Sequence, residues 1–295
     1  MSNSQPRSLK SIELKGVDLR PLEIATEIYY WKPMAALFRS LELRSYRDMG
    51  VVLRGPILDL GCGDGQVACM LEDLNIIEKP LCGIEISAVE LKKARETRSN
   101  INLVQADANR LPFRNESFSG ITCNGVLCSI PEGVDQPLQE AYRVLQKTGV
   151  LVATIPTNKF VEVLLLPKVL RRISKTLSSF YIKRINARLP HFHIYSPEQW
   201  REKFESHGFI VQQVACFFSQ RAGFVWSVLS MQMFRVLGFL KFLKSRMIRD
   251  FTSGALKRTL KRIYVKEATQ AAEYGYVLII AHKREVSEDT TLRQT

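Results

Sequence analysis

The sequence predicts an α/β fold built on a largely parallel sheet. From residue 56 onward, short β-rich runs alternate with amphipathic segments of helical spacing, which is the rhythm of βαβ units. A glycine-rich turn follows the first of these runs directly. With 295 residues, 46% of them hydrophobic and 24% charged, the chain is long enough to bury a core and is not disordered or polytopic in character.

Before the alternation begins, residues 21–44 have helical spacing broken at Pro33, which predicts one or two leading helices. The alternation itself predicts five strands and three intervening helices by residue 156. The strands are expected at residues 57–60, 81–86, 101–105, 120–126 and 149–156, and the helices at 66–74, 87–97 and 136–146.

After residue 156 this rhythm stops. Residues 158–189 have the pattern of mixed apolar and basic helices interrupted at Pro167. A helix is then expected from Ser196, a good N-cap, to Gly208, a good stop signal. Two more strands, at 209–218 and 273–284, flank a long helical insertion.

We therefore divide the chain into a core with two insertions and two ends. The parts are a flexible N-terminus (1–20), cap helices (21–48), the core (49–157, completed by 196–218 and 273–285), a basic helical insertion (158–195), a basic amphipathic insertion (219–272) and a flexible tail (286–295).

The most informative run is ILDLGCGDG, residues 57–65. A strand that ends in Asp59 passes directly into Gly61, Gly63 and Gly65, and glycines let a ligand approach the backbone closely. A carboxylate, Glu85, stands near the end of the next strand, where it can accept hydrogen bonds from ribose hydroxyls. The following two strands end at Asp107 and Asn124, so four strand ends face one crevice.

This ordered set closely resembles the class I S-adenosylmethionine-dependent methyltransferases, in particular the small-molecule group with the ubiquinone/menaquinone C-methyltransferase type of domain. The resemblance rests on ILDLGCGDG, GIEIS, QADANRLPF and EAYRVLQKTGVLVATIP. It implies a Rossmann-like sheet of seven strands in the order 3-2-1-4-5-7-6, with the last strand antiparallel. It also implies S-adenosyl-L-methionine as cofactor and a methyltransferase activity.

The resemblance also assigns roles to individual residues. Gly61, Cys62, Gly63 and Gly65 would form the loop under the methionine part of the cofactor, braced by Asp59; Glu85 would hold the ribose, Ile86 would pack on the adenine, Asp107 and Ala108 would contact the adenine edge, and Asn124 would lie near the methionine amino group. One departure is that Ser119 and Gly120 occupy the start of the fourth strand, where the family usually has an aspartate. That aspartate is mostly structural, so the cofactor assignment stands.

The six cysteines have neither CxxC pairing nor zinc-ligand spacing, so we expect reduced thiols and propose no metal site. Three side chains before the Ser196 helix, His191, His193 and Tyr195, are candidates for a catalytic base at the rim of the site. The alternative is that they only cap and pack this turn.

The charge of +13 is concentrated in residues 158–266, with 21 Lys/Arg against 5 Asp/Glu. Such a stretch attracts an anionic membrane, an RNA or an acidic substrate. Residues 222–243 place Val225, Leu229, Val236, Leu240 and Leu243 on one helical face and Ser227, Ser230, Arg235, Lys241 and Lys244 on the other. In residues 256–267, Leu256, Leu260 and Ile263 oppose Lys257, Arg258, Lys261 and Arg262.

These faces favour a helix lying on a membrane surface over one that spans it. We therefore expect an enzyme that methylates a lipophilic or lipid-linked small molecule, cytoplasmic and peripheral on the inner face of the membrane. A lid or a dimer interface would explain the same helices equally well. An RNA methyltransferase is a minor alternative, because the residues from Asn124 do not form the [DN]-P-P-[YF] motif expected for methylation of base amino groups. An inactive cofactor-binding protein is another alternative. The chemical identity of the acceptor and the oligomeric state are not encoded in any recognisable pattern.

Overall fold

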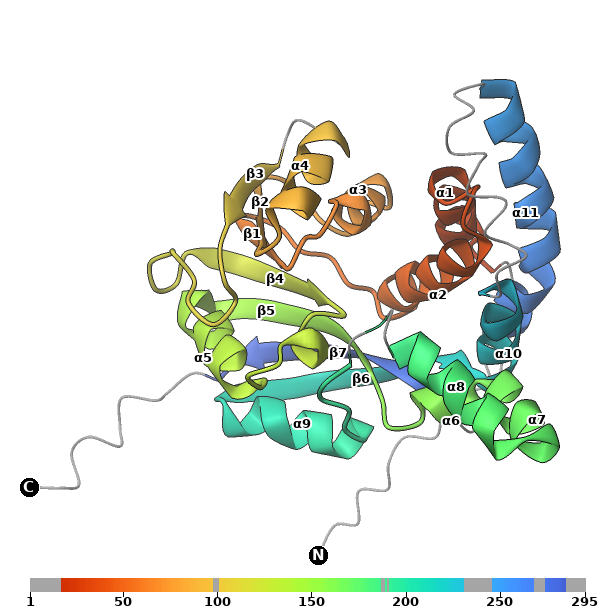
Figure 1. Cartoon of the computed structure of the whole chain (residues 1–295). Helices are drawn as coiled ribbons and strands as arrows, with labels where there is room; N and C mark the ends of the chain where they lie inside the picture. Colours follow the sequence, from red (N-terminus) through yellow and green to blue (C-terminus); the bar gives the residue numbers. More distant parts are fainter. Residues whose placement is uncertain are drawn as a thin grey trace, which may run out of the picture.

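A seven-stranded sheet forms the centre of the molecule (Figure 1). The computed structural model describes residues 17–97, 101–186, 189, 191–230, 246–267 and 274–284. The strand order is β3-β2-β1-β4-β5-β7-β6, with β7 antiparallel to both neighbours and β1 to β5 parallel. The predicted fold and strand order are thus confirmed. The strands are β1 (Ile57–Leu60), β2 (Leu81–Glu85), β3 (Asn102–Gln105), β4 (Phe118–Asn124), β5 (Leu145–Pro156), β6 (Phe209–Ser219) and β7 (Tyr274–Lys283).

The sheet is buried on both faces, which explains its nearly continuous apolar strands. Successive side chains of a strand alternate between two cores. In β7, Leu278 and Ile280 belong to one core, whereas Val277 and Ile279 belong to the other. The first core lies under helices α2, α3, α10 and α11, and the second under α5 and α9. Figure 1 shows these two groups of helices on different sides of the sheet.

Most helices begin and end close to the start and stop signals predicted from the sequence. They are α1 (Arg20–Ile28), α2 (Pro33–Asp48), α3 (Gln66–Asp73), α4 (Ala88–Thr97), α5 (Asp135–Val144), α6 (Phe160–Val163), α7 (Leu165–Ile173), α8 (Lys175–Asn186), α9 (Pro197–Ser206), α10 (Gln220–Leu229) and α11 (Arg246–Glu267), with a short 3-10 turn at Leu127–Ser129. Helix α9 begins with a capping box in which the Ser196 hydroxyl accepts from Gln199 N–H. Gly208 follows the helix with φ of 86°, as its place after the last turn requires.

Helix α2 is the element that brings the N-terminal segment to the sheet. Pro33 stands at its first turn, where a missing N–H costs nothing, so the proline separates α1 from α2 as predicted. Leu37 and Leu41 are buried in the first core. The same helix contacts β6 and β7, and the cavity described below lies beside it.

Several predicted boundaries are wrong. Strand β4 spans Phe118–Asn124 instead of residues 120–126, and β5 begins at Leu145 instead of residue 149. Helix α5 ends at Val144 and not at residue 146, because Leu145 already pairs with Phe118 of β4. Pro167 does not interrupt the basic helices, since it is the third residue of α7, where the backbone N–H needs no intrahelical partner. The breaks fall at Leu164 and Ser174, both in extended conformation.

The second insertion also departs from its predicted faces. Ser227, expected on the polar face, is completely buried, with its hydroxyl donating to Gly223 O. Leu256 and Ile263 pack on the first core and Leu260 is buried in it, because α11 lies against α1 and α2. That apolar face is covered by the protein, so it is not available to a membrane.

Val225 and Leu229, expected on the apolar face, pack on the first core. The expectations for Val236, Leu240, Leu243, Arg235, Lys241 and Lys244 fall outside the described residues, as do residues 1–16 and 285–295. Among the helices that are described, none is long and apolar enough to cross a membrane.

Close packing of α10 on α6 depends on Gly223. A Cβ built at this position would lie 2.5 Å from Val163 O, which is backbone and cannot rotate away. We expect Gly223→Ala to lower the free energy of unfolding by about 1–3 kcal/mol through overpacking. Gly254→Ala in α11 is the matched control, because no atom lies within 4 Å of its Cβ, and it should add about 0.5–1 kcal/mol. Urea unfolding of both variants would test this, and equal effects would contradict it.

Candidate active site

The glycine loop between β1 and α3 has the backbone that its sequence predicts. Gly61, Gly63 and Gly65 all have positive φ, between 54° and 75°, a region costly for other residues. A Cβ on Gly61 would approach the Val126 side chain to 2.4 Å, so the loop contacts the segment after β4. A Cβ on Gly63 would meet no atom within 4 Å. Open space therefore lies beside the loop at Gly63.

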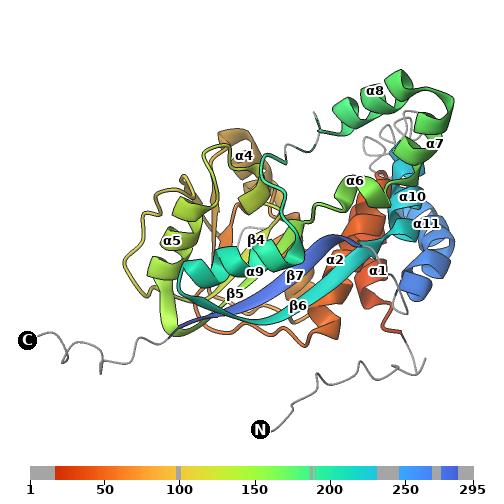
Figure 2. The same ribbon diagram turned by 90° about the horizontal axis from the view of Figure 1, so that it is seen from below.

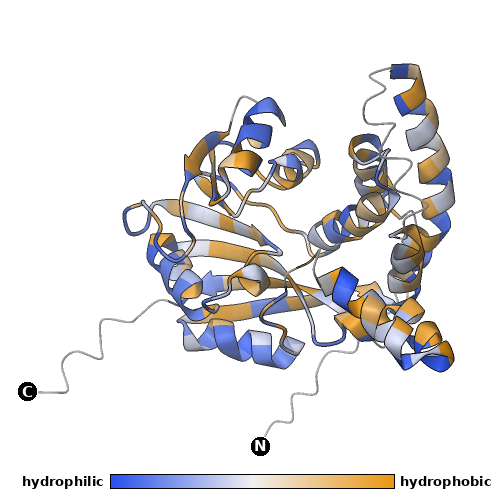
Figure 3. Ribbon diagram, in the orientation of Figure 1, coloured by the Kyte–Doolittle hydropathy of each residue, from blue (hydrophilic) through white to orange (hydrophobic). Residues whose placement is uncertain are grey.

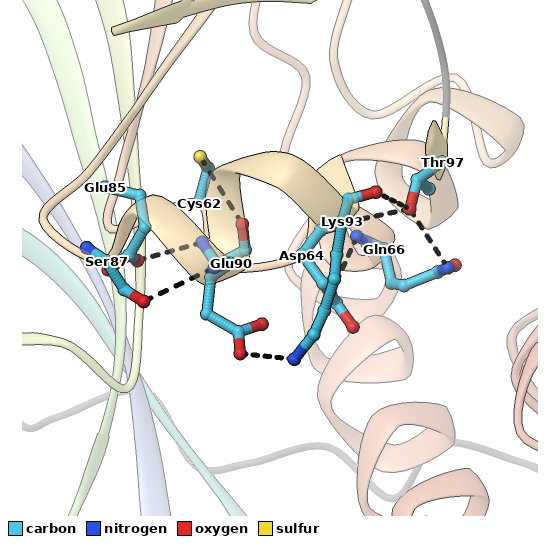
Figure 4. A network of polar contacts seen from close by, with 9 residues as sticks. Cys62, Asp64, Gln66, Glu85, Ser87, Glu90, Lys93 and Thr97 are labelled. Atoms are coloured by element: carbon cyan, nitrogen blue, oxygen red, sulfur yellow. Dashed lines mark hydrogen bonds and ion pairs between the residues drawn. The ribbon is translucent and has the colours of Figure 1, made fainter. Parts of the chain in front are cut away.

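Glu85 at the end of β2 braces this loop. Its carboxylate accepts from Gly63 N–H at 3.1 Å and from Ser87 N–H at 2.9 Å. The polar contacts in Figure 4 also show the Thr97 hydroxyl donating to Asp64 O at 2.9 Å, which ties the loop to α4. Each Glu85 oxygen accepts one of these hydrogen bonds and can accept more. The carboxylate is thus held in place with acceptor capacity left.

The neighbouring strand ends are open to solvent. Ile86 is 64% exposed and Val89, the second residue of α4, is 65% exposed. Asp107, after β3, is exposed and accepts from Asn109 N–H at 2.9 Å, while Ala108 is half-buried beside it. Exposed apolar and polar groups are thus close together in sequence at these strand ends. A surface that binds a nucleobase needs both kinds of group.

Asp59 and Cys62 lie on the inner side of the loop. Burial raises the pKa of Asp59 to about 6, although the 2.8 Å hydrogen bond from the Thr122 hydroxyl opposes this. That bond links β1 to β4. Cys62 is buried against Gly83, whose Cβ would lie 2.8 Å from Sγ. Burial raises its thiol pKa, with the Asp59 carboxylate adding to the effect, so the thiol is an unreactive packing group.

Asn124 at the end of β4 belongs to a polar network with α2 and β5 that the sequence did not reveal. Its Oδ1 accepts from the Tyr46 hydroxyl at 2.7 Å and lies 3.2 Å from Thr154 Oγ1. Thr154 donates its single proton more closely to Glu42, at 2.6 Å. Glu42 is 1% exposed and pairs with Arg39, one turn earlier in α2. The Asn124 Nδ2 group is buried and has no partner in the described part of the chain.

A cavity of about 220 Å³ adjoins this network. Its lining joins α2, the end of β4, α6, α10, β7 and the segment before α9. The aromatic members are Phe38, Phe160, Trp226 and Tyr276, and the polar members include Lys32, Arg39, Glu42, Asn124 and His191. A cavity that combines aromatic walls with a few polar groups is typical of small-molecule sites.

Comparisons with known proteins agree with this geometry. Residues 58–153, the glycine loop through β5, match the family model described as a methyltransferase domain. The chain is 28% identical over 183 residues to a demethylmenaquinone methyltransferase of Staphylococcus aureus, covering 59% of this chain and 76% of that protein.

Residues 58–153 form a class I S-adenosylmethionine-dependent methyltransferase domain.

Two further matches describe the same domain. An uncharacterised methyltransferase of Bacillus subtilis, YodH, is 37% identical over 101 residues, which cover 33% of this chain but only 41% of that protein. The solved structure of a putative sarcosine dimethylglycine methyltransferase from Galdieria sulphuraria superposes with a TM-score of 0.53 and 19% identity, covering 85% and 87% of the two chains. That structural likeness concerns the fold.

The residues of this methyltransferase fit its cofactor. The glycine loop leaves open space at Gly63, Glu85 retains free acceptor sites, and Asn124 Nδ2 is a buried donor without a partner. The roles predicted for individual residues remain predictions. At the start of β4, where the family usually has an aspartate, the Ser119 hydroxyl donates to Arg54 O and lies 3.1 Å from Pro56 O.

The three candidate bases occupy different surroundings. His191 lines the cavity, and its Nε2 lies 3.4 Å from the Tyr276 hydroxyl. Burial lowers its pKa to about 4, so the ring is neutral at pH 7. His193 and Tyr195 are outside the cavity lining; their rings stack at 6.5 Å, and His193 Nε2 is buried with no partner among the described residues. In that same part of the chain, no cluster of His, Cys, Asp and Glu could hold a metal ion.

The environment of Asp59 predicts a pH dependence of stability. The pKa of this carboxyl is about 6 in the fold against its usual 3.8, so its stabilising contribution is complete below pH 4 and is lost as pH rises through 6. Relative to Asp59→Asn, the wild type should lose about 3 kcal/mol between pH 4 and pH 7. Urea unfolding of both proteins across this range is the test, and parallel pH profiles would refute the assignment.

Proposed function

We propose that this methyltransferase transfers a methyl group from S-adenosylmethionine to a lipophilic small molecule held in the cavity beside α2, at or near a membrane surface. One observation carries the proposal. The aromatic cavity reaches Asn124 and Gly125 at the end of β4, and the next residue, Val126, packs on Gly61 of the glycine loop. Donor and acceptor spaces would therefore meet at the end of β4.

On the donor side, Gly61 and Gly63 would pass beside the methionine part and Glu85 would accept from the ribose hydroxyls. Exposed Ile86 would pack on the adenine, with Asp107 and Ala108 at its edge. The Asn124 amide, left with unpaired hydrogens, is placed to donate to an oxygen of the methionine part or of the acceptor. Burial of an unpaired donor is costly, so a bound oxygen would remove that cost.

On the acceptor side, the bound sulfonium supplies an electrophilic methyl, and the chain must align a nucleophile and take up a proton if one is released. His191 is the cavity residue suited to accept that proton, because burial keeps it neutral. A histidine with so low a pKa is a weak base, which favours acceptors that give up a proton readily. His193 and Tyr195 would then shape the turn rather than touch the acceptor.

The lipophilic character of the acceptor follows from the four aromatic rings of the lining. Phe160 contacts Tyr276 edge to face at 5.4 Å, and Trp226 contacts Phe160 at 6.2 Å. Such rings bind flat apolar groups well. The demethylmenaquinone methyltransferase similar to this chain has, by its name, a quinone-type substrate, and a ring of that class would suit these walls.

Glu85→Ala tests the donor site. Loss of a charged acceptor for two ribose hydroxyls should raise the Kd for S-adenosylmethionine by about 100-fold. Glu90→Ala is the matched control, because that half-buried carboxylate pairs only with Lys93 among the contacts drawn in Figure 4. Isothermal titration calorimetry measures both, and thermal unfolding verifies the fold. A Glu85→Ala affinity within twofold of the wild type would eliminate the ribose assignment.

Ala35→Trp tests the acceptor cavity. Ala35 is part of the lining, and an indole there would occupy much of the space without reaching the glycine loop. We expect transfer of labelled methyl into the organic-soluble fraction of a lipid extract to fall more than about tenfold, with the Kd for S-adenosylmethionine within twofold. Ala35→Ser should remain active. Equal transfer by both variants would place the acceptor elsewhere.

A further inference from the structure

Helices α7 and α8 carry an exposed surface that is both apolar and basic. Its apolar members are Val169, Ile173, Leu177 and Phe180, which are 42%, 74%, 45% and 61% exposed. Its basic members, Lys168, Arg171, Arg172 and Lys175, are exposed beside them. We name these eight residues the α7–α8 surface. In Figure 2 the two helices lie at the outer edge of the molecule, and Figure 3 shows orange and blue segments intermixed on them.

The inner side of the same helices is fixed to the protein. The Ser178 hydroxyl donates to Pro167 O at 2.9 Å, and Tyr181 donates to Ser227 O of α10 at 3.2 Å. Ile185 is 7% exposed and belongs to the first core. Both helices therefore already pack one face against the rest of the protein. The exposed apolar side chains lie outside that packed face.

The charge of this region has one sign. Residues 163–197 contain seven Lys/Arg and no Asp/Glu. Within the described chain, none of the four basic members of the α7–α8 surface forms an ion pair, whereas Lys159 just before α6 pairs with Glu162 at 2.9 Å. The α7–α8 surface thus places exposed aliphatic and aromatic side chains between cations that have no anionic partner in the described chain. Such a surface is complementary to a lipid bilayer with anionic headgroups. RNA binding would call instead for a stacking platform of aromatic side chains.

The chain that follows α8 leads to the cavity. Leu189 and His191 line the cavity, and Phe192 and Ile194 are 56% and 37% exposed. The backbone of this segment is held by Phe192 N–H and His193 N–H, which both donate to Cys128 O. Residues 191–194 thus contribute one cavity-lining side chain and two exposed apolar side chains.

We propose that the α7–α8 surface docks the methyltransferase on an anionic lipid bilayer, so that the cavity takes its acceptor from the membrane. This inference rests on the proposed function for the acceptor, but docking itself is a separate property of the surface. It also moves the membrane contact from the face of α11, which is covered, to the first insertion.

The experiment is flotation of the full-length chain with vesicles of phosphatidylcholine alone and with 30% phosphatidylglycerol. The wild type should bind the anionic vesicles and release at high salt. Arg171→Gln/Arg172→Gln/Lys175→Gln should weaken binding about 100-fold, because each cation near the lipid contributes a factor of about five. Ile173→Ser/Leu177→Ser/Phe180→Ser should weaken it at least tenfold even at low salt, by removing inserted apolar groups.

Met247→Ser/Phe251→Ser in α11 is the matched control, because these side chains are 77% and 72% exposed and lie off the α7–α8 surface; it should bind as the wild type does. The proposal is overturned if the two triple variants bind vesicles as well as the wild type does, or if only the α11 control loses binding. It is also overturned if the protein binds RNA but not vesicles, or if it self-associates through this surface. Titration with S-adenosylmethionine is run in parallel: vesicle binding without cofactor binding would refute the proposed function while leaving docking intact.

Discussion

A buried carboxylate, Glu42, is the constraint on which the arrangement of the site depends. It is 1% exposed, and it is held by Arg39 of its own helix and by the Thr154 hydroxyl of β5 at 2.6 Å. A buried charge is tolerated only with such partners, and removal of one partner typically costs about 3–5 kcal/mol. The pairing therefore fixes α2 against the carboxyl-terminal end of β5. Tyr46 adds a second tie, to Asn124 of β4.

The position of α2 determines what the sheet can do. The glycine loop and Glu85 form a donor surface that any sheet of this order would present at its strand ends. Helix α2 adds a cavity at one side of that surface, because Phe38, Arg39 and Glu42 form part of its wall. The helices after β5 and β6 contribute Phe160 and Trp226 to the opposite wall. Cofactor chemistry belongs to the shared sheet, and acceptor choice belongs to the added helices.

This division also explains how far the sequence could be interpreted. The donor site was predictable because its determinants are local: a strand, a glycine turn and a carboxylate twenty residues later repeat a spacing set by βαβ geometry. Glu42 could not be recognised, since its partner Thr154 is 112 residues away and an acidic residue in an amphipathic helix usually faces solvent. Tyr46 could not be recognised either, because its partner Asn124 is 78 residues away.

Helical periodicity has a related limit. It identifies an apolar face correctly but not what covers that face, as α11 shows by packing Leu260 against the protein. Ser227 of α10 is buried because Gly223 beside it allows close approach to α6, a feature that hydropathy does not record. Conversely, Ile173 and Phe180 lie in helices of ordinary apolar pattern, and only the fold shows them exposed.

The central claim is that the donor surface and the cavity beside α2 form one continuous site. A crystal structure of the chain with S-adenosylhomocysteine tests it most directly. The account predicts the ribose on Glu85, the methionine part along Gly61 and Gly63, and the sulfur facing the cavity next to Asn124. A product bound with its sulfur walled off from that cavity, or bound away from the glycine loop, would contradict it.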